Sequence, residues 1–181
     1  MHTFSHHTSL YLPLAVVTAL IASVWDIKTR RIPNWLTLSS ILAGVAVHAA
    51  LGGGRGVLTA LAAALVGGGI FAIFFVAGGM GGGDVKLMAA IAAIVGFQSL
   101  FQVMVSTAIM GGVFAICLAL ARGRLRQTAD NIKLLMVHHR HQGLTPHPEI
   151  NVTNRQTLRL PYAIAIAAGC LITYIGNVPL R

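Results

Sequence analysis

The chain has 181 residues, of which 56% are hydrophobic and only 9% are charged, and its formal net charge is +9. A soluble domain usually carries about 25% charged residues, so this composition excludes an ordinary soluble globular protein. The basic residues are not interleaved with aromatic ones, which argues against nucleic acid as the partner. The two cysteines, Cys117 and Cys170, are too few for a disulfide framework or a zinc site.

Apolar residues form blocks of the size that crosses a bilayer, which takes about 17–25 helical residues. The blocks are Leu10–Trp25, Trp35–Leu51, Val57–Ala77, Val85–Phe97, Ser99–Ala121 and Leu160–Leu180. The fourth block is short, but Val85–Ala121 as one helix would be too long at about 1.5 Å per residue, so a turn is expected near Gly96–Ser99. The sequence therefore predicts an all-α polytopic membrane protein, a bundle of six transmembrane helices with residues 1–181 as one membrane-embedded domain.

Lys and Arg accumulate on the cytoplasmic side of a membrane, and here they fall almost entirely on one side of the six predicted spans. Only Arg55 and Arg181 lie on the other side. The cytoplasmic set is Lys28, Arg30, Arg31, Lys86, Arg122, Arg124, Arg126, Lys133, Arg140, Arg155 and Arg159. We therefore expect both termini outside the cytoplasm and the excess positive charge near anionic lipid headgroups.

Residues 122–159 form the one sizeable polar region, which is predicted to be a basic cytoplasmic loop. Within it, Leu125, Ala129, Ile132 and Met136 recur at spacings of four, three and four. This periodicity predicts a helix over Leu125–Val137 that lies on the membrane surface. The stretch that follows, HHRHQGLTPHPE, contains two prolines and is predicted to be irregular.

The histidines of this loop, His138, His139, His141 and His147, invite a metal-site interpretation. They lack a cysteine or a paired acid at ligand spacing, so a basic loop is expected instead. No metal and no other cofactor is predicted. His48 is expected at the membrane interface, near the outer end of the second span.

Asp26 and Asp84 are the two acidic residues beside predicted spans. Asp26 lies in WDIKTRRIPNWLT at the inner end of the first span, and Asp84 lies in GGMGGGDVKLMAA at the inner start of the fourth. Ionisable groups at membrane depth are costly and usually face the bundle interior or a water-filled cavity. Two carboxylates facing one cavity oppose each other's ionisation, so one holds a proton while the other stays charged. Such a pair supplies a general base for water and a general acid for the leaving amine, which predicts peptide-bond hydrolysis.

Other residues around the pair have more than one interpretation. Gly81 and Gly83 are expected to give an extended backbone that approaches a peptide substrate closely. Asp84 taken alone is also a candidate helix N-cap, a structural role. Pro33 and Asn34 are expected to form the turn into the second span and to cap it.

The basic residues near the two acids are candidate supporting groups. Lys28, Arg30 and Arg31 follow Asp26. They are expected to attract an acidic part of a substrate, to keep Asp26 charged, or only to set the orientation of the chain in the membrane. Lys86 supports the site or extends toward the lipid headgroups.

The segments DIKTRRIPN and MGGGDVKL closely resemble the type IV prepilin peptidase family of GxGD aspartyl proteases. The size of the chain and LPYAIAIAAG in the last span look most like the short branch that serves tight-adherence (Flp) pili. The resemblance implies cleavage of prepilin or pseudopilin leader peptides at the cytoplasmic face of the bacterial inner membrane, on substrates with a hydrophobic N-terminal helix. It also implies that Asp26 and Asp84 are the catalytic dyad and that Gly81 and Gly83 are the motif glycines. Longer members also methylate pilins with a domain that carries CxxC pairs, and since this chain has no CxxC, no methyltransferase is expected.

Two other functions are compatible with carboxylates in a membrane protein. A proton-coupled carrier would place acids near the middle of the bilayer and show an inverted repeat, and neither is evident in the sequence. A pilus-assembly scaffold that binds prepilin without cutting it would need neither acid, yet both are present. An aspartic endopeptidase is therefore the leading hypothesis.

Overall fold

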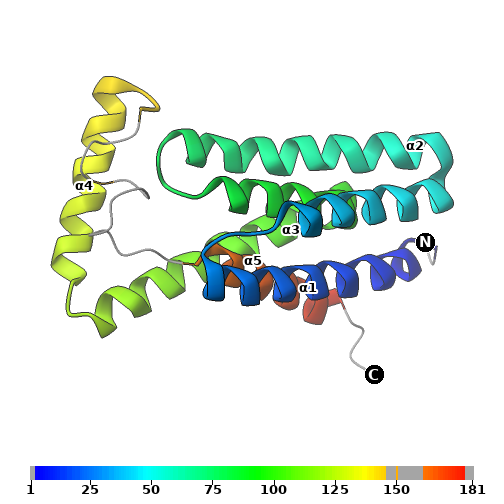
Figure 1. The fold of residues 1–181 in the computed structure, drawn as a ribbon, viewed down its shortest axis with the longest axis horizontal. Helices are drawn as coiled ribbons and strands as arrows, with labels where there is room; N and C mark the ends of the chain where they lie inside the picture. The colour runs from blue at the N-terminus through cyan, green and yellow to red at the C-terminus, as the bar shows by residue number, and fades with distance from the viewer. Residues whose placement is uncertain (1–2, 146–149, 151–160, 178–181) are drawn as a thin grey trace.

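The computed structural model describes residues 3–145, 150 and 161–177, with side chains described from residue 11 onward. These residues form five helices and no strands, so the all-α prediction is confirmed for them (Figure 1). The helices are α1 (Thr3–Thr29), α2 (Asn34–Val76), α3 (Gly82–Ala121), α4 (Leu125–Gln142) and α5 (Tyr162–Asn177). Four of them form one bundle, and α4 crosses one end of it (Figure 1).

The two longest helices are each interrupted at a glycine. α2 has 43 residues and leaves helical geometry at Gly53 (φ 56°, ψ −142°), and α3 has 40 residues and leaves it at Gly96 (φ 63°, ψ −176°). Glycine adopts positive φ readily because it has no Cβ. At each break the ribbon reverses, so the two halves of each helix run in opposite directions (Figure 1). The predicted break near Gly96 is therefore present.

The five described helices do not match the six predicted spans one to one. Among the described residues, three helices are long and apolar enough to cross a membrane, over Tyr11–Thr29, Asn34–Val76 and Gly82–Ala121, and the apolar α5 is shorter. The prediction of six transmembrane helices is not confirmed, because the structure assigns five helices and two of the long ones contain a break.

Large apolar side chains cover the outside of the bundle. Leu65 of α2 and Phe101 of α3 are each 77% exposed, and many other Leu, Ile, Val and Phe side chains are more than 40% exposed. Soluble monomers rarely expose continuous apolar patches of this kind. Together with the long apolar helices, this surface identifies an integral membrane protein.

Small residues allow the helices of the bundle to approach closely. The first half of α3 is the centre, with an almost unbroken buried run from Leu87 to Val95, and α2 and α5 pack on α3. A Cβ added to Gly44 of α2 would lie 2.7 Å from the backbone of Ala93, and one added to Gly169 of α5 would lie 2.7 Å from the backbone nitrogen of Thr107. Close approach at small residues is a main source of attraction between helices in a membrane.

His48 links three helices at the end of the bundle opposite α4. Its Nε2 atom lies 3.1 Å from the carbonyl oxygen of Ile94, just before the α3 break. Its ring stacks on that of Tyr11, with ring centroids 4.6 Å apart. His48 is only partly buried, and its ring contacts two other helices of the bundle.

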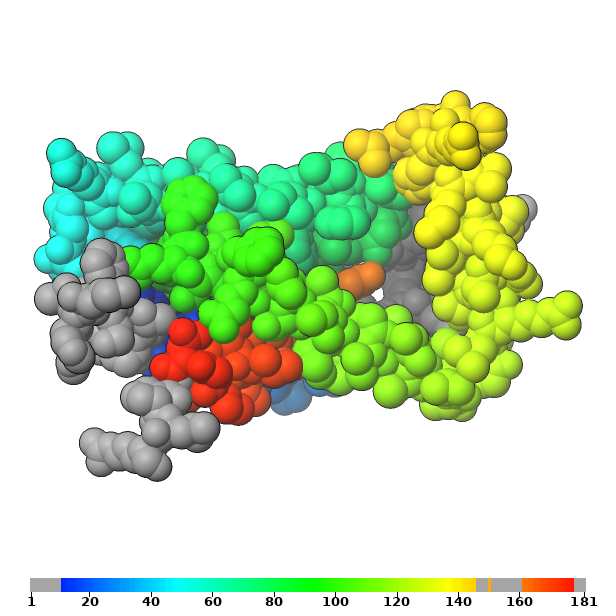
Figure 2. Space-filling model, turned by 180° about the vertical axis from the view of Figure 1, so that it is seen from behind, coloured from blue at the N-terminus to red at the C-terminus, as the bar shows by residue number. Residues whose placement is uncertain are grey.

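The helix predicted over Leu125–Val137 is present as α4, and it is longer than expected. The prediction that the chain becomes irregular from His138 onward is wrong up to Gln142, because nothing breaks the helix before Gly143. Gly143 ends it with φ 67°, and its N–H donates to the carbonyl oxygen of His139 (3.1 Å). The rest of the predicted irregular stretch lies largely outside the described residues, including His147. Figure 2 shows α4, in yellow, standing beyond the end of the bundle.

Candidate active site

A tight turn after α1 fixes the backbone around Asp26. The hydroxyl of Thr29 donates to the carbonyl oxygens of Trp25 (2.9 Å) and Arg31 (3.0 Å). Arg30 adopts a φ of 53°, and its N–H donates to the carbonyl oxygen of Asp26 (2.7 Å). Left-handed backbone closing the last turn is a common helix ending, although it favours glycine over a residue such as Arg. Asp26 is therefore held on the final turn of α1, where its side chain is half-buried.

Asp84 lies on the first turn of α3 and bonds back to the residue before the helix. Gly81 has an extended backbone (φ −84°, ψ 151°), and its N–H donates to Oδ2 of Asp84 (3.2 Å). In return the N–H of Asp84 donates to the carbonyl oxygen of Gly81 (3.1 Å). This reciprocal pair is a capping box in which Gly81 is the N-cap and Asp84 is the third helical residue. The prediction that Asp84 is itself the N-cap is therefore wrong, although its side chain bonds back to the N-cap residue.

The capping bond uses only one oxygen of the Asp84 carboxylate. Within the described part of the chain, Oδ1 accepts no hydrogen bond, although the side chain is only 9% exposed. Oδ1 is not among the fully buried side-chain atoms that lack a partner in the described residues, so it is accessible to water or to a substrate.

The turn into α2 rests directly on the start of α3. Ile32 is buried against Gly83, where a Cβ would lie 3.4 Å from the Cβ of Ile32. Gly83 lies inside the first turn of α3, so the expected extended backbone is present at Gly81 and absent at Gly83. Both backbone groups of Gly81 are bonded to Asp84, so this glycine supports the carboxylate rather than offering a free N–H.

A hydrogen bond joins Lys86 to the same turn. The ammonium of Lys86 donates to Oδ1 of Asn34 (3.0 Å) across 52 residues of sequence. Asn34 is therefore not the cap of α2: the N-cap is Pro33, which makes no side-chain capping bond. Asn34 instead ties the start of α2 to the helix that carries Asp84.

Three helices bring polar groups to one end of the bundle. The carboxylates of Asp26 and Asp84 lie within electrostatic range of each other. Arg30 acts electrostatically on Asp26, and Asp84 acts electrostatically on Tyr162, the half-buried first residue of α5. The site therefore combines two carboxylates, a guanidinium and a phenol.

Tyr162 is the residue of this site that sequence reasoning missed. It entered only as one letter of the LPYAIAIAAG segment and not as a candidate site residue. Its available signal was the polar tip of an aromatic residue, directly after Pro161, at the start of the last apolar block. The side chain of Tyr162 is partly buried and packs against the hydrophobic core, as is typical of a tyrosine with one apolar and one polar end.

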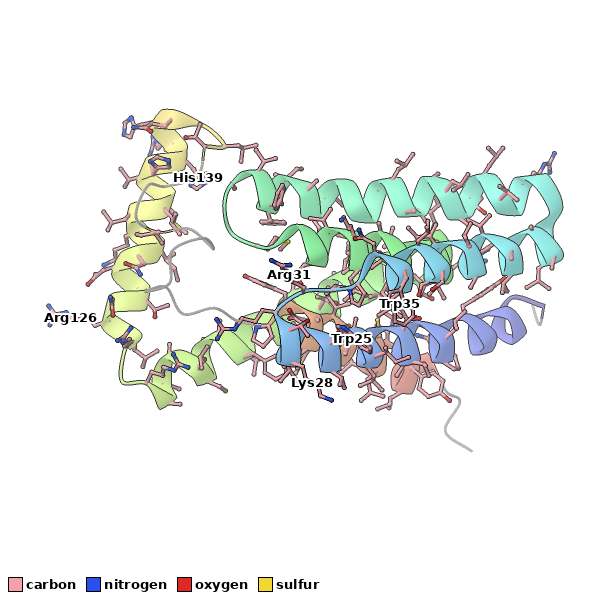
Figure 3. The ribbon with its side chains drawn as sticks, viewed as in Figure 1. Trp25, Lys28, Arg31, Trp35, Arg126 and His139 are labelled. Atoms are coloured by element: carbon pink, nitrogen blue, oxygen red, sulfur yellow. The ribbon has the colours of Figure 1, made fainter. Side chains whose placement is uncertain are left out.

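Lys28 and Arg31 lie at the same end of the bundle but are exposed (Figure 3). In the described residues, neither side chain forms an ion pair or hydrogen bond with Asp26, and Arg30 is the cation that acts on it. Beside them, Trp25 and Trp35 meet edge to face, with ring centroids 5.9 Å apart (Figure 3). Tryptophan is typical of the membrane–water boundary.

The carboxyl groups of Asp26 and Asp84 are groups that can donate and accept protons. Among the described residues, no three His, Cys, Asp or Glu side chains gather as metal ligands would. Two carboxylates that share one environment can divide into a protonated and a charged group. Together they can activate a water molecule and protonate a leaving group, which is acid–base hydrolysis.

The comparisons with known proteins agree with this chemistry. The sequence model of the type IV leader peptidase family matches residues 14–116, a segment that contains both aspartates and the glycines before Asp84. No curated protein and no solved structure matches the chain significantly. Because the family match covers more than half of a chain built from apolar membrane helices, the chain belongs to the type IV leader peptidase family.

Proposed function

We propose that this hydrolase is an aspartic endopeptidase that removes the leader peptides of Flp-type prepilins or pseudopilins, with Asp26 and Asp84 as its catalytic dyad. Membership of the leader peptidase family supports prepilins as the substrate class. The observation that carries the dyad is the electrostatic proximity of two carboxylates from α1 and α3, one of which has an oxygen that accepts no hydrogen bond from the described residues.

In the proposed reaction, the charged carboxylate takes a proton from water as the water oxygen attacks the scissile carbonyl carbon. The protonated carboxylate donates its proton to the carbonyl oxygen, which gives a neutral tetrahedral intermediate. When the C–N bond breaks, the first carboxylate returns its proton to the leaving nitrogen, and the second recovers a proton from the collapsing hydroxyl. Both carboxyl groups end in their starting states, so the dyad needs no other reactant than water.

The proposed topology has six crossings, with α2 and α3 each crossing twice. The reversals at Gly53 and Gly96 support this count, since 43 helical residues would extend about 64 Å and a bilayer core is about 30 Å thick. The distribution of Lys and Arg supports an orientation in which the end with Asp26 and Asp84 lies at the cytoplasmic face of the inner membrane. A prepilin carries its own hydrophobic helix, so we propose that it reaches the dyad from within the bilayer.

The supporting residues take more specific roles in this proposal. Gly81 and Gly83 orient Asp84 and admit Ile32 beside it. Lys86 holds the turn after α1 through Asn34. Lys28 and Arg31 are exposed cations at the rim, where they can contact acidic residues near the cleavage site.

The direct test of the function is cleavage of a purified Flp-type prepilin by the purified protein in lipid nanodiscs. We expect a shift on a gel and a new N-terminus, determined by sequencing, at the junction of leader and mature pilin. If a folded preparation cuts none of several Flp-type prepilins and pseudopilins, the proposed activity is wrong.

The bond between Lys86 and Asn34 predicts a coupled effect on cleavage. Lys86→Ala and Asn34→Ala should each lower kcat/KM by about 3–10-fold, because either one frees the turn that positions Asp26 relative to Asp84. The double variant should lose no more than the worse single variant, since both changes remove one bond. Arg55→Ala, an exposed cation in the turn of α2 at the other end of the bundle, is the control and should cleave normally. If the double variant loses as much as the product of the two single losses, the two residues act independently and their hydrogen bond has no role in cleavage.

A further inference from the structure

Tyr162 lies at the end of the bundle that carries both aspartates. It is the first residue of α5, which packs against α1 and α3. Figure 1 shows the start of α5 at the same end of the bundle as the end of α1, which carries Asp26, and the start of α3, which carries Asp84. The side chain of Tyr162 is partly buried and packs against the hydrophobic core, so the core holds the ring at this end.

The hydroxyl of Tyr162 has no hydrogen-bond partner among the described residues, and it is not one of their fully buried atoms. The same is true of Oδ1 of Asp84. The two side chains lie within electrostatic range of each other, yet no hydrogen bond joins them. A hydrogen-bond donor from α5 and an acceptor from α3 are therefore both accessible at the candidate site, and a third polar group between them can bind both.

A phenol has the chemistry to assist attack on a peptide carbonyl. It loses its proton only at about pH 10, so at neutral pH its hydroxyl is a hydrogen-bond donor. Negative charge develops on the carbonyl oxygen when water attacks the carbon, and a fixed donor that binds this oxygen typically raises kcat by about 10²–10³-fold. The oxygen has two lone pairs, so it can accept a hydrogen bond from a phenol as well as the proton of a carboxyl group.

We propose that Tyr162 is a further catalytic residue, whose hydroxyl donates a hydrogen bond to the carbonyl oxygen of the scissile peptide bond as water attacks. The hydroxyl keeps its own proton throughout, so the proton transfers of the two carboxyl groups stay balanced as described above. The bond uses the lone pair of the carbonyl oxygen that the protonated carboxyl group leaves free. This inference rests on the proposed cleavage, because it gives Tyr162 a role in that reaction.

The first test is Tyr162→Phe, which removes the hydroxyl and keeps the ring that packs against the core. One carboxyl group still protonates the same oxygen, so we expect the kcat of prepilin cleavage in nanodiscs to fall by about 10–100-fold, less than the largest losses of a single donor. KM should stay within about twofold, since the bond strengthens only as charge develops in the transition state.

The matched control is Tyr174→Phe. Tyr174 is a second partly buried tyrosine of α5 that packs against the core, but it lies near the other end of the helix. Its variant loses the same hydroxyl group at a distance from the candidate site, so it should cleave at the rate of the unchanged protein.

A second test changes the acidity of the phenol without removing it. A fluorinated tyrosine incorporated at position 162 ionises at lower pH than tyrosine, and an ionised phenol cannot donate. We expect the fall of kcat at alkaline pH to begin at lower pH than in the unchanged protein. The same fluorinated residue at position 174 should leave the pH profile unchanged.

The outcomes separate this inference from the proposed function. If the unchanged protein cleaves prepilin and Tyr162→Phe keeps its kcat, the role of Tyr162 is wrong while the proposed function stands. A rise in KM alone, an equal loss in Tyr174→Phe, or a pH profile that the fluorinated residue at 162 does not move would also overturn it. If the unchanged protein cuts no prepilin, the proposed function fails, and this inference fails with it.

Discussion

Asp84→Asn is expected to reduce prepilin cleavage by about 10²–10⁴-fold or more, because the variant can neither accept nor donate the proton in the proposed step. The substitution separates catalysis from helix capping. The amide oxygen of Asn can still accept the N–H of Gly81, so the bond that begins α3 survives. Asp26→Asn should give a loss of the same order for the same reason. The side chain of Asp26 makes no hydrogen bond with the described residues, so this loss would not come from a broken structural contact.

The matched control for both is Asp130→Asn. Asp130 is an exposed aspartate on α4, outside the proposed dyad, and its variant should cleave at the rate of the unchanged protein. All variants are compared at equal amounts of folded protein, with cleavage followed by gel shift over time. Near-normal cleavage by Asp84→Asn would leave that residue with its capping role alone.

Gly44→Ala is expected to destabilise the bundle by about 1–3 kcal/mol, the usual cost of overpacking a tight contact. A methyl group at Gly44 would lie 2.7 Å from the carbonyl carbon and oxygen of Ala93 and 2.8 Å from the nitrogen of Ile94. These are backbone atoms at the centre of α3, so they cannot move aside as a flexible side chain would. The measurement is the midpoint of thermal unfolding in detergent, and we expect it to fall.

Gly69→Ala is the control for this substitution, on the same helix. Nothing lies within 4 Å of a Cβ built there, and alanine is favoured over glycine inside a helix by about 1 kcal/mol. Its midpoint should stay the same or rise. Equal midpoints for the Gly44 and Gly69 variants would show that α2 and α3 do not pack as closely as described.

The features that could be predicted from the sequence are those set by the membrane itself. A charge is costly at membrane depth, so Asp26 and Asp84 stand out from an apolar chain with four acidic residues. Bilayer thickness limits helix length, which is why Val85–Ala121 had to turn, and α3 does break at Gly96. The helix of the polar region was visible from the period of its apolar residues, and it is present as α4.

The features that could not be predicted depend on contacts between distant parts of the chain. The bond from Lys86 to Asn34 and the packing of Ile32 on Gly83 form only when the turn after α1 rests on the start of α3. Tyr162 joins the site only because α5 packs beside α3. For the same reason, the sequence did not predict the contacts of His48 with Tyr11 and Ile94.

Local backbone geometry explains the remaining differences. The prolines beyond α4 suggested that the chain leaves the helix at His138, but the residue that ends it is Gly143, whose positive φ favours glycine. Arg30, not Lys28 or Arg31, acts on Asp26, and Arg30 is also the residue with left-handed backbone in the turn after α1. Lys28, Arg30 and Arg31 lie so close in sequence that their spacing does not show which of them acts on Asp26.

The most direct test of a shared dyad is single-turnover cleavage of one prepilin by Asp26→Asn, by Asp84→Asn and by the doubly substituted protein, at equal folded concentration. Residues that act as one catalytic unit have non-additive effects, so removing the second adds little once the first is gone. We predict that the double variant loses about as much activity as either single variant. A double variant whose loss equals the product of the two single losses, or a single variant that keeps nearly full activity, would contradict the dyad.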